Sequence, residues 1–222
     1  MGGQPLSPRE VTNMYLSRLR LNLSNRNVRR DVANIYEAHR TILRAFPDTS
    51  DGGPGRVLFR IEPPEADGTV PVIVQSDKEP QWKRLEDLSG YTASPVETKQ
   101  FSLNLHQGQR LAFRLLANPT VKRDKKRYGL LREHEQKAWL ERKASGGGFR
   151  IIGVTIRNPD TVSGKKNIET PLSVKFIAVL FDGILEVENP DIFISTIKKG
   201  IGSAKGFGFG LLSVAPVELF YE

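Results

Sequence analysis

A tyrosine and a histidine stand three positions apart in the stretch NIYEAHR, residues 34–40, and an arginine follows the histidine. Because histidine titrates near neutral pH, His39 could take a proton from a ribose 2′-hydroxyl or give one to a departing 5′-oxygen. Tyr36 could orient that histidine or donate a hydrogen bond to a phosphate oxygen. These residue types suit metal-free attack on a ribose phosphodiester, provided that the imidazole is accessible.

The segment that carries this pair is predicted to be a helix. Asn34 followed by Glu37 is typical of an N-cap with its capping-box partner, and a proline follows Phe46. His39 falls within the helix's apolar stripe, with Tyr36 at its edge, and this favours a core histidine. Both residues nevertheless lie in the first two turns, where free backbone N–H groups and the helix dipole attract phosphate. A core histidine and a histidine beside a bound phosphate therefore both stay open. The apolar stripe consists of Ile35, Ile42, Leu43 and Phe46.

Metal and serine-nucleophile chemistry find little support. The histidines His39, His106 and His134 are far apart, and the chain has no cysteine, no HExxH and no tight cluster of carboxylates. No GxSxG nucleophile elbow occurs either. We therefore expect no metal and no cofactor, with His106 in a turn and His134 on a solvated helix face.

Positive charge predicts a polyanionic partner. Lys and Arg number 33 against 25 acids, which gives a net charge of +8. Residues 18–44 contain seven arginines, among them Arg29, Arg30 and Arg40, against two acids. Arginine's planar fork of donors suits phosphate recognition. A second basic run, TVKRDKKRYG at 120–129, is either part of such a surface or a solvated hairpin tip.

Glycines concentrate in KKGIGSAKGFGFG, residues 198–210. Gly200, Gly202 and Gly206, with Lys205 among them, would let backbone amides approach phosphate closely. The spacing matches neither a Rossmann nor a P-loop motif, and a helix precedes the segment where those motifs need a strand. Composition alone favours a flexible helix-to-strand connection.

The coarse pattern predicts an α+β protein with two tandem ferredoxin-like, RRM-like domains, each with the order βαββαβ. Residues 1–13 are interpreted as an extension or expression remnant, 14–95 as the N-terminal domain and 96–222 as the C-terminal domain. Asp182-Gly183 predicts a tight hairpin. Expected strands are 14–23, 56–63, 70–76, 109–117, 149–157, 173–181, 184–188 and 209–216; expected helices are 34–46, 80–88, 131–144 and 190–199.

No apolar window approaches the roughly 20 residues of a membrane span, and the first residues lack the pattern of a secretory signal. We therefore expect a cytoplasmic protein without a membrane partner.

Six stretches together resemble the CasE family, the CRISPR repeat-processing endoribonucleases of type I-E Cascade complexes. They occur in the family's order between Met14 and Pro216: MYLSRLRLN, RRDVANIYEAHRTI, GQRLAFRLLANPT, KAWLERKASGGGFRI, VLFDGILEV and KKGIGSAKGFGFGLLSVAP. The resemblance implies the tandem fold and an enzyme that binds the stem-loop of CRISPR repeat RNA. It further implies metal-free cleavage at the 3′ side of the stem by 2′-hydroxyl attack, which leaves a 2′,3′-cyclic phosphate. The implied partners are pre-crRNA, the crRNA stem-loop and the other Cascade subunits.

The resemblance also assigns residues. The family's Y-x-x-H falls on Tyr36 and His39, which makes His39 the general acid or base. The glycine-rich segment becomes an RNA-contacting or structurally essential loop, and a basic hairpin around Lys165 and Lys166 would grip RNA. Two alternatives remain: a non-catalytic module that binds structured RNA, and a subunit that only docks onto an assembled ribonucleoprotein.

Overall fold

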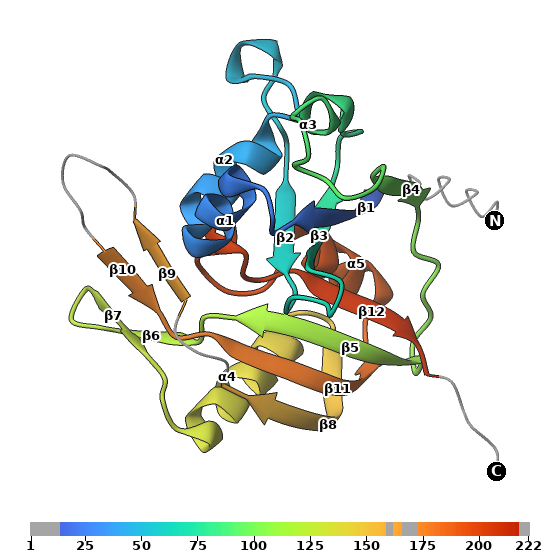
Figure 1. The fold of residues 1–222 in the computed structure, drawn as a ribbon. Helices are drawn as coiled ribbons and strands as arrows, with labels where there is room; N and C mark the ends of the chain where they lie inside the picture. The colour runs from blue at the N-terminus through green and yellow to red at the C-terminus, as the bar shows by residue number, and fades with distance from the viewer. Residues whose placement is uncertain (1–13, 159–161, 166–172, 218–222) are drawn as a thin grey trace, which may run out of the picture.

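The computed structural model describes residues 14–158, 162–165 and 173–217 (Figure 1). Its first half contains one antiparallel sheet with the strand order β2-β3-β1-β4. Numbered along the chain, this is the 4-1-3-2 order of a ferredoxin-like βαββαβ unit. The strands are β1 (Met14–Asn22), β2 (Val57–Ile61), β3 (Thr69–Ser76) and β4 (Glu97–Phe101); the helices are α1 (Arg26–Ala33), α2 (Ile35–Leu43), the short 3₁₀ helix η1 (Thr49–Asp51) and α3 (Lys83–Glu86).

The second half repeats this topology with the strand order β12-β5-β11-β8. Two hairpins are inserted between its strands: β6 with β7, and β9 with β10. The predicted α+β class with two ferredoxin-like units is confirmed. The elements are β5 (Arg110–Ala117), β6 (Thr120–Arg123), β7 (Lys126–Gly129), α4 (Glu133–Ser145), β8 (Phe149–Arg157), β9 (Val162–Lys165), β10 (Ser173–Phe176), β11 (Val179–Val187), α5 (Pro190–Lys199), η2 (Lys205–Phe207) and β12 (Leu212–Pro216).

The prediction of a tight hairpin at Asp182-Gly183 is wrong. Both residues lie within β11, which pairs with β5 on one side and β8 on the other. The Asp182 carboxylate accepts hydrogen bonds from Arg114 of β5, at 2.7 Å, and from Arg157 of β8. A Cβ on Gly183 would overlap the carbonyl oxygen of Gly153 in the neighbouring strand. The glycine permits close strand packing here, and the aspartate neutralises flanking arginines instead of turning the chain.

Two further elements differ from the prediction. No helix was expected between the strand at 14–23 and the helix at 34–46, but this stretch contains α1, whose N-cap Asn25 accepts a hydrogen bond from the backbone N–H of Asn27 at 2.8 Å. β4 pairs with β1 and so completes the first sheet, although it lies after the domain boundary placed at residue 95. β4 is an edge strand of mostly exposed polar side chains, so it carries no hydrophobic signal. None of the described helices is long and apolar enough to cross a membrane.

The two halves contact each other through β2 and β3. Arg60 of β2 is 4% exposed and donates a hydrogen bond to Ser213 Oγ in β12 at 3.0 Å. The buried Gln75 side chain of β3 donates to the carbonyl oxygen of Ile197 in α5, also at 3.0 Å. These contacts place the segment that joins α5 to β12 beside the first sheet.

Candidate active site

Helix α2 positions the tyrosine and the histidine. Its N-cap is Asn34, as predicted, and the Asn34 carbonyl oxygen accepts hydrogen bonds from the backbone N–H groups of Glu37 and Ala38 at 2.8 and 3.2 Å. The face towards the core buries Ala38, Thr41 and Ile42. Tyr36 and His39 lie at the margin of that face, and both side chains are half-buried. The histidine is therefore neither fully exposed nor sealed in the core.

The strand beneath the helix fixes the plane of the imidazole. The His39 ring stacks on the fully buried ring of Phe59 in β2, with centroids 5.9 Å apart and planes 14° apart. Sequence reasoning missed Phe59, because an apolar residue in a buried strand carries no signal for a neighbouring helix. Burial lowers the pKa of His39 below its ordinary value, since a partly desolvated imidazole disfavours its charged form. The neutral ring, which can accept a proton, therefore predominates near pH 7.

The glycine-rich loop meets α2, although more than 150 residues separate them in the chain. A Cβ added to Gly206 would lie 3.4 Å from His39 Cε1 and 3.6 Å from Nδ1. Phe207 lies against Tyr36, with ring centroids 6.2 Å apart. A Cβ on Gly208 would approach the Phe59 ring to 3.3 Å. The structure thus brings two separately predicted sequence features to one place, with the loop passing close to α2 in Figure 1.

The loop is closed at its base, unlike the flexible connection that composition favoured. The Ile201 N–H donates to the Gly210 carbonyl oxygen at 2.9 Å. Gly210 has φ +88°, and a Cβ there would lie 2.6 Å from the Ile201 carbonyl oxygen, so only glycine fits. Within the loop, Lys205 is half-buried, and burial together with nearby Arg56 and Lys143 lowers its pKa. A cation so placed would be stabilised by a bound anion.

The three arginines predicted to bind RNA are exposed, and each has an intramolecular contact. Arg29 donates to the carbonyl oxygens of Leu23 and Ser24, both at 2.8 Å. Arg30 pairs with the buried carboxylate of Asp31 at 2.7 Å. Arg40, next to His39, pairs with Glu37 at 3.3 Å on the surface of α2. Arg29 therefore ties α1 to the chain before it, Arg30 neutralises the buried Asp31 within α1, and Arg40 keeps a 64% exposed side chain beside the histidine.

The basic hairpin predicted around Lys165 and Lys166 falls at β9 and β10, which pair antiparallel. β9 lies against α2 (Figure 1), and Lys165 is its last residue. Lys166 lies outside the described residues. The remaining histidines lie elsewhere: His106 is exposed in a turn and His134 is exposed on α4, where the sequence placed them. Over the described ranges 14–158, 162–165 and 173–217, no group of three His, Cys, Asp or Glu side chains could hold a metal ion.

Comparisons with known proteins all find CRISPR-associated proteins. A family model described as CRISPR associated protein matches residues 14–216. The CRISPR-associated endoribonuclease Cse3 of Thermus thermophilus is 41% identical over 215 residues, which cover 91% of this chain and all of the relative. The CRISPR system Cascade subunit CasE of Escherichia coli is 32% identical, with coverage of 83% and 93%. A structure of Cse3 bound to a 19-nucleotide RNA superposes with a TM-score of 0.83 at 39% identity, with coverage of 92% and 100%.

Proposed function

This chain belongs to the CasE family of CRISPR-associated proteins, and from that premise we propose that it is an endoribonuclease that cleaves CRISPR repeat RNA and acts as a Cascade subunit. The relatives named as an endoribonuclease and as a Cascade subunit match along almost their whole length. The observation that carries the catalytic assignment is the half-buried His39, which burial keeps neutral and which faces the glycine-rich loop.

We propose that the reaction is attack by the 2′-hydroxyl on the adjacent phosphorus. Neutral His39 takes the hydroxyl proton as the new O–P bond forms, the bond to the 5′-oxygen breaks, and the departing 5′-oxygen takes a proton from water. The products are a 2′,3′-cyclic phosphate and a 5′-hydroxyl, and no metal takes part. Tyr36, on the same face of α2, donates a hydrogen bond to the phosphate or orients the histidine. Backbone amides of the loop, with Lys205, Arg40 and Lys165 as candidate cations, stabilise the charge that develops on the phosphate.

The proposed substrate is the repeat stem-loop of pre-crRNA, cut at the 3′ side of the stem and retained as crRNA. An A-form stem has a major groove too narrow for side chains to read, so recognition uses phosphates and shape. The residues proposed to contact this RNA are Arg29, Arg30, Arg40, Lys165, Lys166, Gly200, Gly202, Lys205 and Gly206.

Removal of divalent ions tests the metal-free step. Because the proposed nucleophile lies within the substrate, cleavage in excess EDTA should proceed within about twofold of its rate with Mg²⁺. The 5′ fragment should resist a phosphatase until its cyclic end is opened with acid. A substrate with a 2′-deoxyribose at the cut site is the control and should not react. Loss of cleavage in EDTA that Mg²⁺ restores, under conditions where RNA binding is unchanged, would contradict the proposal.

The lowered pKa of His39 predicts how the rate depends on pH. As a base, the histidine is active when neutral, so kcat/KM should reach a plateau towards neutral pH and fall in acid, with a midpoint below the ordinary 6.5 of histidine. The quantity to measure is kcat/KM against pH, because it reports groups of the free enzyme. If His39 instead donated a proton in the rate-limiting step, kcat/KM would fall as the pH rises through its pKa.

A further inference from the structure

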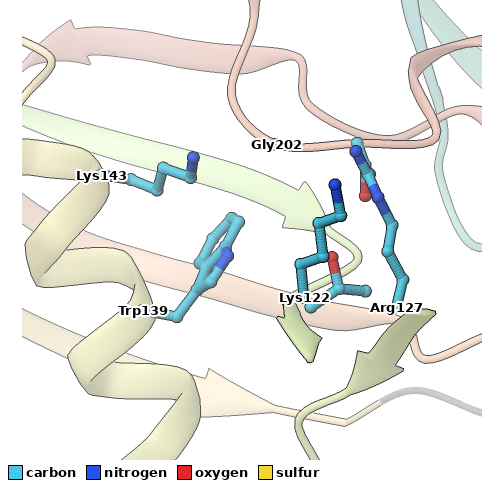
Figure 2. A pocket seen from close by; sticks show the side chains of 7 residues that line it. Lys122, Arg127, Trp139, Lys143 and Gly202 are labelled. Atoms are coloured by element: carbon cyan, nitrogen blue, oxygen red, sulfur yellow. The ribbon is translucent and has the colours of Figure 1, made fainter. Parts of the chain in front are cut away.

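Two pockets adjoin the hairpin of β6 and β7 on the second half of the protein. The first has a volume of 290 Å³ and lies between the hairpin, α4 and the glycine-rich loop (Figure 2). The second, of 310 Å³, shares Arg127 of the hairpin with the first. Thr120, Arg127 and Ser203 line both pockets. Each pocket is near the lower end of the roughly 300–1,000 Å³ typical of small-molecule sites.

The first pocket concentrates positive charge. Lys122 and Arg127 face each other directly across the two strands, so their side chains project from the same face. Lys143 comes from α4, with Nζ 5.9 Å from the centroid of the Trp139 ring. Figure 2 shows the charged ends of all three directed towards the loop that carries Gly202. Among the described residues that line this pocket none is acidic, so a bound anion would relieve the repulsion.

The wall of this pocket is built by the glycine-rich loop. Gly202 has φ +85°, and a Cβ there would lie 3.1 Å from Trp139 Cζ2, so glycine allows the backbone to rest on the indole. Ser203 and Thr120 add hydroxyl groups to the lining. The cation Lys143 also acts on Lys205, whose pKa it helps to lower. The positive field therefore continues from the pocket into the loop segment that contacts His39.

The second pocket is more apolar. Phe176, Ile177 and Ala204 line it together with the shared residues. The Phe176 ring packs on Phe207 with centroids 4.6 Å apart, and Phe207 in turn packs on Tyr36. An apolar pocket with aromatic edges, joined to a cationic pocket, matches the two chemical halves of a nucleotide.

We propose that the two pockets form one site for an unpaired ribonucleotide of the bound RNA. Lys122, Arg127 and Lys143 hold its phosphate, and the pocket of Phe176 and Ile177 takes its base. A base stacked within a duplex cannot enter such a pocket, so the occupant is a nucleotide outside the paired stem. This inference rests on the proposed function, since it assumes that the RNA stem is held beside the glycine-rich loop.

Binding of extended hairpins tests this site. Repeat hairpins with a 2′-deoxyribose at the cut site are compared with and without one to three unpaired nucleotides at either end. For the wild type, an extension at one end should tighten Kd at least fivefold, and an abasic extension should lose most of that gain. Lys143→Ala should reduce the gain below twofold, whereas Lys137→Ala, an exposed lysine on the same helix, should retain it. An equal gain in Lys143→Ala, or no gain at either end, would overturn the proposal.

A second measurement separates this inference from the proposed function. The whole protein is titrated with adenosine 5′-monophosphate, inorganic phosphate and adenosine, and backbone amide NMR shifts are followed. The monophosphate should bind at least tenfold more tightly than either part, with shifts at Ser203 and Ile177, and Lys143→Ala should abolish the effect. Binding of phosphate as tight as that of the nucleotide would reduce the site to an anion site and refute the base pocket. If no hairpin RNA binds, the proposed function fails, and this titration still shows whether the two pockets bind a nucleotide.

Discussion

Replacing His39 with alanine is expected to lower the single-turnover cleavage rate by about 10²–10⁴-fold, the usual contribution of general acid–base catalysis. This loss corresponds to about 3–5 kcal/mol in the activation barrier. The dissociation constant for the repeat hairpin should change by less than about threefold, because phosphate contacts from other side chains dominate affinity. Rates at saturating enzyme and binding of the 2′-deoxy hairpin measure the two quantities separately.

The exposed histidines provide matched controls for this substitution. His106→Ala and His134→Ala remove the same group at positions away from α2, and both variants should cleave like the wild type. Thermal unfolding of His39→Ala should remain cooperative, since the ring is only half-buried. A rate within a few-fold of the wild type would remove His39 from the mechanism.

The same measurements separate the alternative functions. Tight hairpin binding without cleavage in the wild type and in His39→Ala would favour a non-catalytic RNA-binding module. No affinity for isolated RNA would favour a subunit that docks onto an assembled particle. For either RNA-binding function, affinity should fall steeply as salt rises, because each phosphate contact releases condensed counterions.

Periodicity predicted helix α2 but not the exposure of its histidine. Asn34 does begin α2, and Ile42 is buried as the stripe requires. The stripe placed His39 in the middle of the buried face, whereas the ring lies half-buried at its margin, on Phe59 and under Gly206. These neighbours come from two other elements, β2 and the glycine-rich loop. A one-dimensional pattern reports which residues share a helix face, and cannot report how far the partner surface extends over that face.

Two of the features that failed in prediction, the hairpin at Asp182-Gly183 and the missed strand β4, share a physical cause, which is long-range pairing. Asp182-Gly183 has the composition of a turn, but Arg114 and Arg157 on the flanking strands pair with the aspartate, and β11 continues through both residues. β4 has no apolar alternation and exists because β1 offers it a partner edge. The topology itself was predictable, because each half contains enough well-marked strands and helices to define the βαββαβ order.

The glycine-rich loop shows a different limit. Its composition permitted both a flexible linker and a close-packed turn, since glycine suits either. The structure favours the close-packed form, because the Ile201–Gly210 hydrogen bond closes the loop and leaves no room for a Cβ on Gly210. The resemblance to the CasE family predicted an RNA-contacting or structurally essential loop, whereas local composition favoured a flexible connection.

Replacing Arg60 with alanine is expected to lower the free energy of unfolding by about 3–5 kcal/mol, the range for breaking a buried ion pair. The guanidinium lies 2.6 Å from Glu62 and donates to Ser213 Oγ and the Leu211 carbonyl oxygen. Without it, the 17% exposed Glu62 carboxylate loses this partner and keeps a 3.5 Å contact with Arg114. Urea unfolding measures the change. The control is Arg110→Ala, which removes an arginine 63% exposed and paired with Glu186, and it should cost less than about 1 kcal/mol.

The Arg60→Ala substitution should lower the cleavage rate as well as the free energy of unfolding. Arg60 follows Phe59, on which His39 stacks, and its partners Leu211 and Ser213 directly follow the loop that covers the imidazole. The Arg60 side chain thus links β2, which carries Phe59, to the segment that follows the glycine-rich loop. At low temperature, where the variant remains folded, cleavage should be slower than for Arg110→Ala. Full activity in a folded but destabilised Arg60→Ala would show that the loop keeps its place on α2 without this link, through the contacts of Gly206, Phe207 and Gly208 alone.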